Sequence, residues 1–197
     1  MRKLIVGCGY LGSRVARLWR DAGHEVFVVT RSAERARALA ADGYRPIVAD
    51  VLRPQTLAGL PAAETVLYAV GHDRASSGSI HDSYAGGLQS VLDALESEPE
   101  KIIYISSTGV YAQARGETVD EDSATEPVRE GGRASLAAER VLSAHCLGRR
   151  GVVLRLAGLY GPGRIPLAGE ISSGRPIAAP ENGWLNLIHV DDAAAAV

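Results

Sequence analysis

A glycine-rich turn that follows a short apolar run is the feature of this sequence that most constrains its fold. Gly7, Gly9 and Gly12 stand in a G-x-G-x-x-G pattern, directly after the run at 3–6 and at the start of a helical pattern. In a strand–turn–helix unit the first glycine permits the tight turn, the second lets a pyrophosphate approach the backbone, and the third lets helix and strand pack closely. The pattern predicts a dinucleotide site at the helix N-terminus. The alternative is a turn whose glycines serve packing alone.

Short β-branched runs alternate with longer helical patterns along the chain. The strand-like runs lie at 3–7, 25–30, 45–50, 65–71, 101–107 and 151–158, and helical patterns lie at 11–23, 32–43, 82–98 and 129–142. This alternation is typical of βαβ units, whose strands form a parallel sheet. The sequence therefore predicts an α/β, Rossmann-type fold: a doubly wound parallel sheet with helices on both faces.

The composition changes after residue 157, where the chain becomes rich in Gly and Pro. We expect 1–157 to form a dinucleotide-binding Rossmann domain and 158–197 to begin a small substrate-binding portion interleaved with the main sheet. The last residues follow a helical pattern that ends without a cap, so we expect a further C-terminal portion. The polar stretch at 113–132 is predicted to lie over the carboxyl edge of the sheet, with most of its residues simply solvated.

The end of the second predicted strand bears on the choice of coenzyme. NAD-dependent enzymes usually place an acid there against the ribose 2′-hydroxyl, but this chain has Thr30 followed by Arg31. A guanidinium suits the additional 2′-phosphate of NADP, so the motif favours NADP over NAD. Asp50, after the third strand, is either an acceptor for the adenine amino group or a turn cap.

The predicted coenzyme contacts extend beyond the three glycines, Thr30, Arg31 and Asp50. Two of the added residues lie within the glycine loop, one follows Asp50, and three follow the fourth predicted strand and would flank the adenosine. These residues are Tyr10, Leu11, Val51, Ala69, Val70 and Gly71.

Charge and cysteine content limit the classes of function. The formal net charge of −2 does not indicate the basic patch that binds nucleic acid, so we expect no such partner. Cys8 and Cys146 form neither a disulfide framework nor a metal-binding pattern, which indicates a reducing compartment and no metal. The N-terminal apolar run is too short for a signal peptide or a membrane span. We therefore expect a cytoplasmic protein with no membrane partner.

Four further motifs occur in a fixed order after the glycine loop: "YISSTGVYA" at 104–112, "RASLAAERVL" at 133–142, "LRLAGLYGPG" at 154–163 and "LIHVDD" at 187–192. With the loop, they make the chain resemble the extended short-chain dehydrogenase/reductases, and among them the NAD(P)-dependent epimerase/dehydratase-like proteins. The resemblance implies a small-molecule substrate, with nucleotide-linked sugars as the candidate class. It also places Ser107 at the position of the catalytic serine that holds the reacting oxygen of the substrate.

The same resemblance reveals a departure in the helix at 129–142. The family has a Tyr and, four residues later, a Lys whose charge lowers the pKa of the phenol. Here Gly131 stands at the tyrosine position and Ser135 at the lysine position, and no tyrosine elsewhere is followed by a lysine at that spacing. Enzymatic activity would need a substitute phenol, for which Tyr111 is the candidate, with Ser107 as oxygen anchor. The alternative is an inactive NADP-binding redox sensor or regulatory protein.

Two apolar helical patterns, at 84–95 and 135–147, resemble the pair through which related folds form a four-helix bundle between subunits. This resemblance predicts a homodimer. The family's usual asparagines are also replaced, by Tyr84 in the first of these helices and by Gly158 after the sixth strand. The coenzyme half of the sequence therefore matches the family better than the substrate half.

Overall fold

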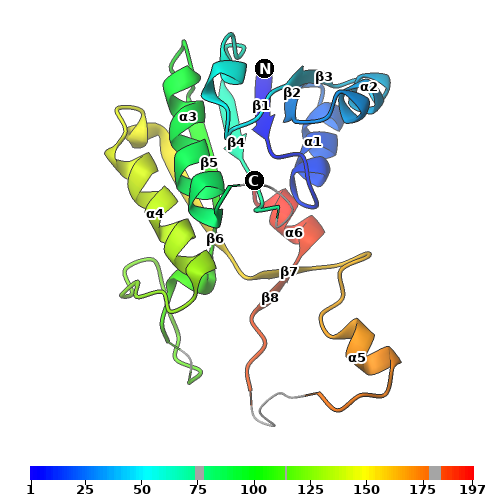
Figure 1. Cartoon of the computed structure of the whole chain (residues 1–197), viewed down its shortest axis with the longest axis vertical. Helices are drawn as coiled ribbons and strands as arrows, with labels where there is room; N and C mark the ends of the chain where they lie inside the picture. The colour runs from blue at the N-terminus through cyan, green and yellow to red at the C-terminus, as the bar shows by residue number, and fades with distance from the viewer. Residues whose placement is uncertain (74–77, 114, 178–182) are drawn as a thin grey trace.

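The computed structural model of the chain describes residues 1–73, 78–113, 115–177 and 183–197. Its main sheet has six parallel strands in the order β3-β2-β1-β4-β5-β6 (Figure 1). The predicted doubly wound parallel sheet is confirmed. The chain moves outward from β1 to β3 and then returns to β4, so the strand order reverses between β1 and β4.

The bounds of the elements follow the predicted alternation. The strands are β1 (Arg2–Val6), β2 (Glu25–Thr30), β3 (Arg45–Val48), β4 (Thr65–Tyr68), β5 (Lys101–Ser107), β6 (Gly151–Leu156), β7 (Gly158–Tyr160) and β8 (Leu187–His189). The helices are α1 (Gly12–Asp21), α2 (Ala33–Ala41), α3 (Gly87–Ala94), α4 (Glu130–Ala144), α5 (Ala168–Ser172) and α6 (Val190–Ala195). Short turns of other helix types are η1 (Pro54–Leu57), η2 (Asp82–Gly86), η3 (Thr108–Val110) and η4 (Gly148–Arg150).

Helices cover both faces of the sheet, and alternate residues of each strand supply the two cores. In β1, Leu4 and Val6 point into the core beneath α3 and α4, whereas Ile5 points into the core beneath α1, α2 and α6. This period of two is what a strand buried on both faces requires. Figure 1 shows α3 and α4 on one side of the sheet and α1, α2 and α6 on the other.

The third predicted helix is shorter than its sequence pattern. Residues 82–86 form the π-helical turn η2, and α3 then ends at Ala94. The Tyr68 hydroxyl donates a hydrogen bond to the Ser83 carbonyl oxygen at 2.5 Å, and a Cβ at Gly87 would overlap the same hydroxyl. The absence of a side chain at Gly87 therefore lets α3 begin close against the buried phenol of β4.

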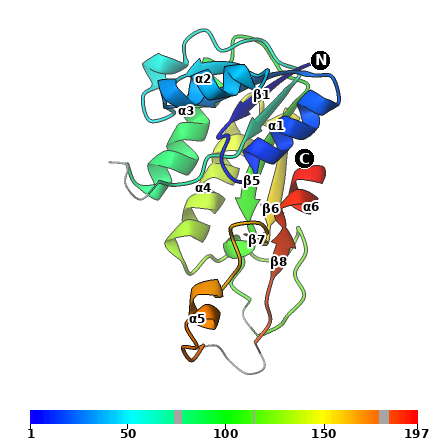
Figure 2. The same cartoon turned by 90° about the vertical axis from the view of Figure 1, so that its right-hand side faces the viewer.

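The segment after residue 157 divides between two places. β7 and β8 form a separate two-stranded parallel sheet, and α5 lies away from the main body (Figure 2). In contrast, α6 packs into the Rossmann core through Val190 and Ala193, and its Asp191 pairs with Arg14 of α1 at 2.8 Å. In the described part of the chain, no helix has the length and apolarity needed to cross a membrane.

The glycine loop is a crowded junction between β1 and α1. Gly7 has a φ of +99°, a conformation that favours glycine, and its carbonyl oxygen lies where a Cβ of Gly12 would be. The absence of a side chain at Gly12 therefore lets α1 begin directly against the end of β1, as predicted for the third glycine of the motif.

We predict that Gly12→Ala destabilises the fold by about 1–3 kcal/mol, because the new methyl group forces the Gly7 backbone to move. Gly9→Ala is the matched control, since its Cβ would meet no atom within 4 Å. Its effect should stay within about 0.5 kcal/mol. Urea denaturation followed by circular dichroism compares the two variants with the parent. Equal stability of both variants would contradict this description of the junction.

Candidate coenzyme-binding site

A cavity of about 380 Å³ opens at the carboxyl ends of β1, β2 and β4, beside the point where the strand order reverses. Doubly wound sheets bind their ligands at this place. Most of the residues predicted to contact the coenzyme line this cavity: Gly7, Gly9, Thr30, Arg31, Asp50, Val51, Ala69, Val70 and Gly71. The fold therefore gathers residues from four separate strand ends, those of β1, β2, β3 and β4, around one cavity.

The backbone of the glycine loop forms one wall of the cavity. A Cβ at Gly9 would meet no atom within 4 Å, so open space lies in front of its backbone, whereas Gly7 packs against the backbone of Ala69. The N-terminus of α1 follows at Gly12. A pyrophosphate fits this arrangement, because the backbone is accessible at Gly9 and the helix dipole favours negative charge.

The remaining loop residues, Tyr10 and Leu11, do not line the cavity. Leu11 is buried in the core beneath α1, and the Tyr10 hydroxyl donates to the Pro162 carbonyl oxygen at 3.2 Å. The Tyr10 ring also lies under two guanidinium groups, those of Arg14 at 4.4 Å and Arg164 at 5.3 Å. These side chains support the loop from behind, and their predicted contact with the coenzyme stays a prediction.

Two arginines stand on the β2–α2 side of the cavity. Arg31 pairs with Asp73 at 2.9 Å, and both side chains are about half exposed. Arg35 donates from Nη2 to the carbonyl oxygen of Cys8 in the glycine loop at 2.5 Å. These two guanidinium groups share the cavity with the carboxylates of Asp73 and Asp50.

Sequence reasoning missed Arg35, although a signal for it was present. Ser32 accepts a hydrogen bond from the Arg35 backbone N–H at 3.2 Å and so caps α2. A recognisable cap places Arg35 in the first helical turn, next to the glycine loop. Its spacing of four from Arg31 would then have suggested a second cation on the same side of the site.

Asp50 is a turn cap, and its predicted contact with the adenine amino group stays a prediction. Its Oδ1 accepts a hydrogen bond from the Leu52 backbone N–H at 3.0 Å, and the residue also lines the cavity.

Two histidines follow β4 at the same carboxyl edge of the sheet, and they differ in position. His72 lines the cavity with Nδ1 at 3.3 Å from the Ser83 hydroxyl, whereas His81 is exposed.

The helix that carries the reactive pair in the family is present here in a modified form. In α4, Gly131 would place a Cβ 3.7 Å from Ile80, an ordinary contact, so a side chain is sterically tolerated at its root. Ser135 is buried, with 3% of its surface exposed. Gly132 packs against the carbonyl of Gly109, which holds the start of α4 against the turn after β5. Gly131 and Ser135, where the resemblance to the family places the tyrosine and the lysine, thus lie in a continuous helix.

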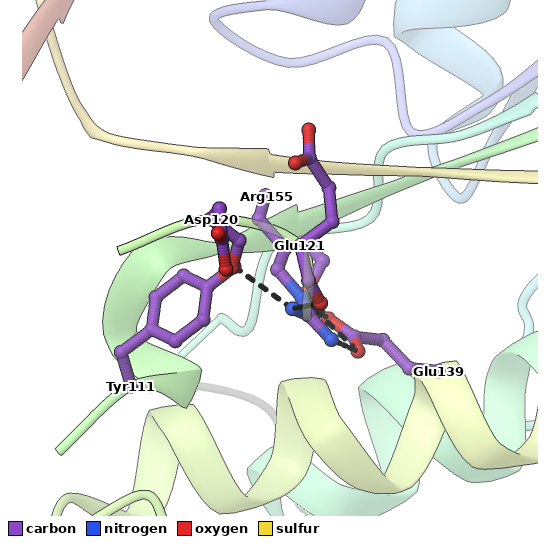
Figure 3. Close-up of polar contacts among 6 residues, drawn as sticks. Tyr111, Asp120, Glu121, Glu139 and Arg155 are labelled. Atoms are coloured by element: carbon purple, nitrogen blue, oxygen red, sulfur yellow. Dashed lines mark hydrogen bonds and ion pairs between the residues drawn. The ribbon is translucent and has the colours of Figure 1, made fainter. Parts of the chain in front are cut away.

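Ser107 is the last residue of β5, and Tyr111 follows the short turn η3, and the two side chains have different partners. The Ser107 hydroxyl accepts a hydrogen bond from the Gly109 backbone N–H at 3.0 Å and so caps η3. The Tyr111 hydroxyl donates to the Asp120 carbonyl oxygen at 2.7 Å and accepts from Arg155 Nη1 at 2.8 Å (Figure 3). Neither residue lines the cavity at the glycine loop. Their predicted catalytic roles stay predictions.

A polar network around Arg155 connects β6, α4 and the loop after β5. The Arg155 guanidinium forms an ion pair with Glu139 at 2.8 Å, and the two side chains are only 20% and 9% exposed. Ser106 donates a hydrogen bond to the same carboxylate at 2.5 Å. The hydrogen bonds to Glu139 raise the pKa of Arg155. Figure 3 shows the guanidinium between Glu139 and Tyr111, so one cation anchors the loop to the helix.

Two other tyrosines are poorly suited to act as a base near neutral pH. Tyr68 and Tyr104 lie on β4 and β5 beneath α3 and α4, and burial raises the pKa of both phenols. A phenol that stays protonated cannot act as a base.

Within the described residues, no three His, Cys, Asp or Glu side chains gather into a metal-binding group.

The parallel sheet, the glycine loop and the cavity at the switch point define the class: a Rossmann-fold protein with a site suited to a dinucleotide. A family model described as the NAD dependent epimerase/dehydratase family matches residues 4–197. The chain therefore belongs to the NAD-dependent epimerase/dehydratase family, which confirms the resemblance to extended short-chain dehydrogenase/reductases.

Individual relatives agree with this assignment. Protein YeeZ of Escherichia coli (strain K12) is 34% identical over 207 residues, which cover 100% of this chain and 72% of that protein. A protein from Methylobacillus flagellatus, provisionally assigned as an NAD-dependent epimerase/dehydratase, has 36% identity and a TM-score of 0.77, covering 98% of this chain and 67% of that one.

A more distant structure shows the extent of the shared fold. The dTDP-glucose 4,6-dehydratase DesIV from Streptomyces venezuelae, solved with NAD and TYD bound, has a TM-score of 0.81 at 20% identity. The match covers 99% of this chain and 70% of that one. At this identity the likeness shows the fold alone.

We predict that Arg155→Met destabilises the protein by about 3 kcal/mol, because it leaves the Glu139 carboxylate buried without its cation. Tyr111→Phe removes a single hydrogen-bonding group and should cost about 1 kcal/mol. In a double-mutant cycle with Glu139→Leu, the Arg155 and Glu139 changes should deviate from additivity by at least ~1 kcal/mol. Chemical denaturation provides the four free energies of unfolding. Additive effects would show that the pair does not stabilise the fold as a unit.

Proposed function

We propose that the protein binds NADP(H), with the adenosine half in the cavity at the ends of β1, β2 and β4. The observation that carries the proposal is the joint placement of the glycine loop and two arginines around this one cavity. The open backbone at Gly9 would receive the pyrophosphate, and Arg31 and Arg35 would face the ribose at the end of β2. When bound, the nicotinamide supplies hydride transfer; the residues of the chain orient it.

The electrostatics of the cavity wall support NADP over NAD. Thr30 offers no carboxylate to a ribose 2′-hydroxyl, and its hydroxyl lies 3.4 Å from the Ser32 backbone N–H. A 2′-phosphate carries more charge than the Asp73 carboxylate and can take up the Arg31 guanidinium in its place. Arg35 would then provide a second cation from α2.

For the substrate, we propose a small molecule of the nucleotide-linked sugar class. Support comes from family membership and from structural relatives named as epimerases and dehydratases of such sugars. Catalysis would need Ser107 to hold the substrate oxygen and Tyr111 to supply the phenol. Because Tyr111 is bound to Arg155 and to the Asp120 carbonyl, it would have to exchange one of these partners for the substrate.

A second candidate function is coenzyme binding without turnover, for redox sensing or regulation. The replacement of the tyrosine and the lysine by Gly131 and Ser135 favours it, since neither residue can transfer a proton near neutral pH. The helix itself is retained, which fits a protein that keeps the fold for binding alone.

For either function we propose a homodimer that pairs through α3 and α4, the two helices that lie side by side on one face.

The coenzyme proposal predicts that NADPH binds at least about tenfold more tightly than NADH, a difference of about 1.4 kcal/mol. Arg31→Ala and Arg35→Ala should each remove most of this difference while leaving NADH affinity nearly unchanged. Arg37→Ala is the matched control, because it removes the same charge from α2 outside the cavity lining. Fluorescence titration of each variant provides the constants. Equal binding of NADH and NADPH by the parent would overturn the preference, and no binding of either would overturn the site.

Turnover assays distinguish the two candidate functions. If the protein is an enzyme, coenzyme oxidation or epimer formation should appear with at least one nucleotide-linked sugar in a panel. Ser107→Ala and Tyr111→Phe should then lower kcat by about 10²-fold or more without changing coenzyme affinity. Coenzyme binding with no product on any panel member, at enzyme concentrations equal to substrate, is the result expected of the sensor.

A further inference from the structure

A second cavity lies between α1 and α2, behind the glycine loop. It measures about 660 Å³, within the range of small-ligand sites. Arg14, Arg17 and Arg20 of α1 line it, and their spacing of three places them along one side of that helix. Arg35 of α2 completes a set of four guanidinium groups that face the same space.

The charge of this cavity opposes that of the chain as a whole. Among its lining residues, four arginines stand against two acids, Asp42 and Asp191, which leaves a local formal charge of +2 (four minus two). The whole chain carries −2. A concave region of one sign concentrates ions of the opposite sign, so the cavity attracts anions that the rest of the surface repels.

Several donors in the cavity have capacity for a ligand. Arg14 uses Nε for Asp191 and Nη1 for the Tyr10 carbonyl, and Arg20 binds Asp21 and the Asp42 carbonyl. Arg17, in contrast, makes no hydrogen bond or ion pair within the described residues. A guanidinium has five N–H groups, so even the paired arginines retain donors.

Tyr44 contributes the polar end of an otherwise buried ring to the same cavity. Its ring lies 5.2 Å from the Arg20 guanidinium, and its hydroxyl makes no hydrogen bond within the described residues. Burial raises the pKa of the phenol, so it stays an O–H donor at neutral pH.

We propose that this cavity is a binding site for a small anion bearing phosphate groups, separate from the coenzyme cavity. Phosphate suits it better than a single carboxylate, because a tetrahedral group presents oxygens to guanidinium groups on two helices at once. Arg17 and Tyr44 would supply the donors that the protein itself leaves unused.

The two cavities share a wall, which couples the proposed site to the glycine loop. Cys8 and Arg35 line both, and Arg35 donates to the Cys8 carbonyl oxygen. An anion that recruits Arg35 would withdraw it from the coenzyme side. Substitutions that distinguish the two cavities must therefore change a residue that lines only one of them. Arg17 lines only this cavity, and Arg31 lines only the coenzyme cavity.

Isothermal titration with inorganic pyrophosphate, in low-salt buffer without coenzyme, tests the proposal. Because the glycine loop also suits a pyrophosphate, the parent should bind up to two equivalents, one in each cavity. Arg17→Gln should weaken binding in this cavity about fivefold, the upper end for an exposed ion pair. Arg37→Gln removes the same charge from α2 outside both cavities and should leave the affinity of this cavity unchanged, as should Arg31→Gln. Thermal melts check that each variant is folded.

Three results would overturn the proposal: no saturable binding, equal weakening by Arg37→Gln, or weakening by Arg31→Gln without any by Arg17→Gln. The second would indicate unspecific attraction to positive charge. The third would place the pyrophosphate in the coenzyme cavity. Because no coenzyme is present in the titration, failure of the NADP(H) proposal would leave this result unaffected.

Discussion

The close approach of Gly12 to the carbonyl of Gly7 is the constraint on which the rest of this structure depends. It lets α1 begin at the end of β1 instead of one turn further away, so the helix N-terminus and the open backbone of Gly9 face the same space. β4 then packs against Gly7 from the other side, through the backbone of Ala69. The cavity at the switch point is bounded by this glycine backbone and by side chains at the ends of β2, β3 and β4.

The coenzyme half of the site keeps the sequence motif of the family better than the α4 half does. The coenzyme half keeps the glycine loop and has two arginines beside it, whereas α4 has Gly131 and Ser135 where the resemblance to the family places a tyrosine and a lysine. The helix nevertheless stays in register, because Gly132 packs on Gly109 and Glu139 holds Arg155 across to β6. Packing and a buried ion pair maintain the geometry of this helix independently of the chemistry it carries in relatives, so loss of the reactive groups need not disturb coenzyme binding.

Much of the fold could be predicted from the sequence, since each buried strand is a short β-branched run and the glycine loop identifies the switch point. The contacts of the site were harder to predict from the sequence. Arg35 reaches the glycine loop only because Ser32 starts α2 at a particular residue. The partners of Tyr111 depend on the path of a polar loop that has no periodic pattern, and the hydrogen bond from the Tyr68 hydroxyl to Ser83 joins β4 to the turn before α3. Contacts of this kind join residues far apart in the sequence and leave no local pattern.

The most direct measurement of the central claim is a crystal structure of the protein grown with NADPH. We expect the pyrophosphate on the backbone at Gly9, the adenosine between the ends of β2 and β4, and the 2′-phosphate within hydrogen-bonding distance of Arg31 and Arg35. A coenzyme bound elsewhere, or a 2′-phosphate directed away from both arginines, would contradict the proposed mode of NADP(H) binding.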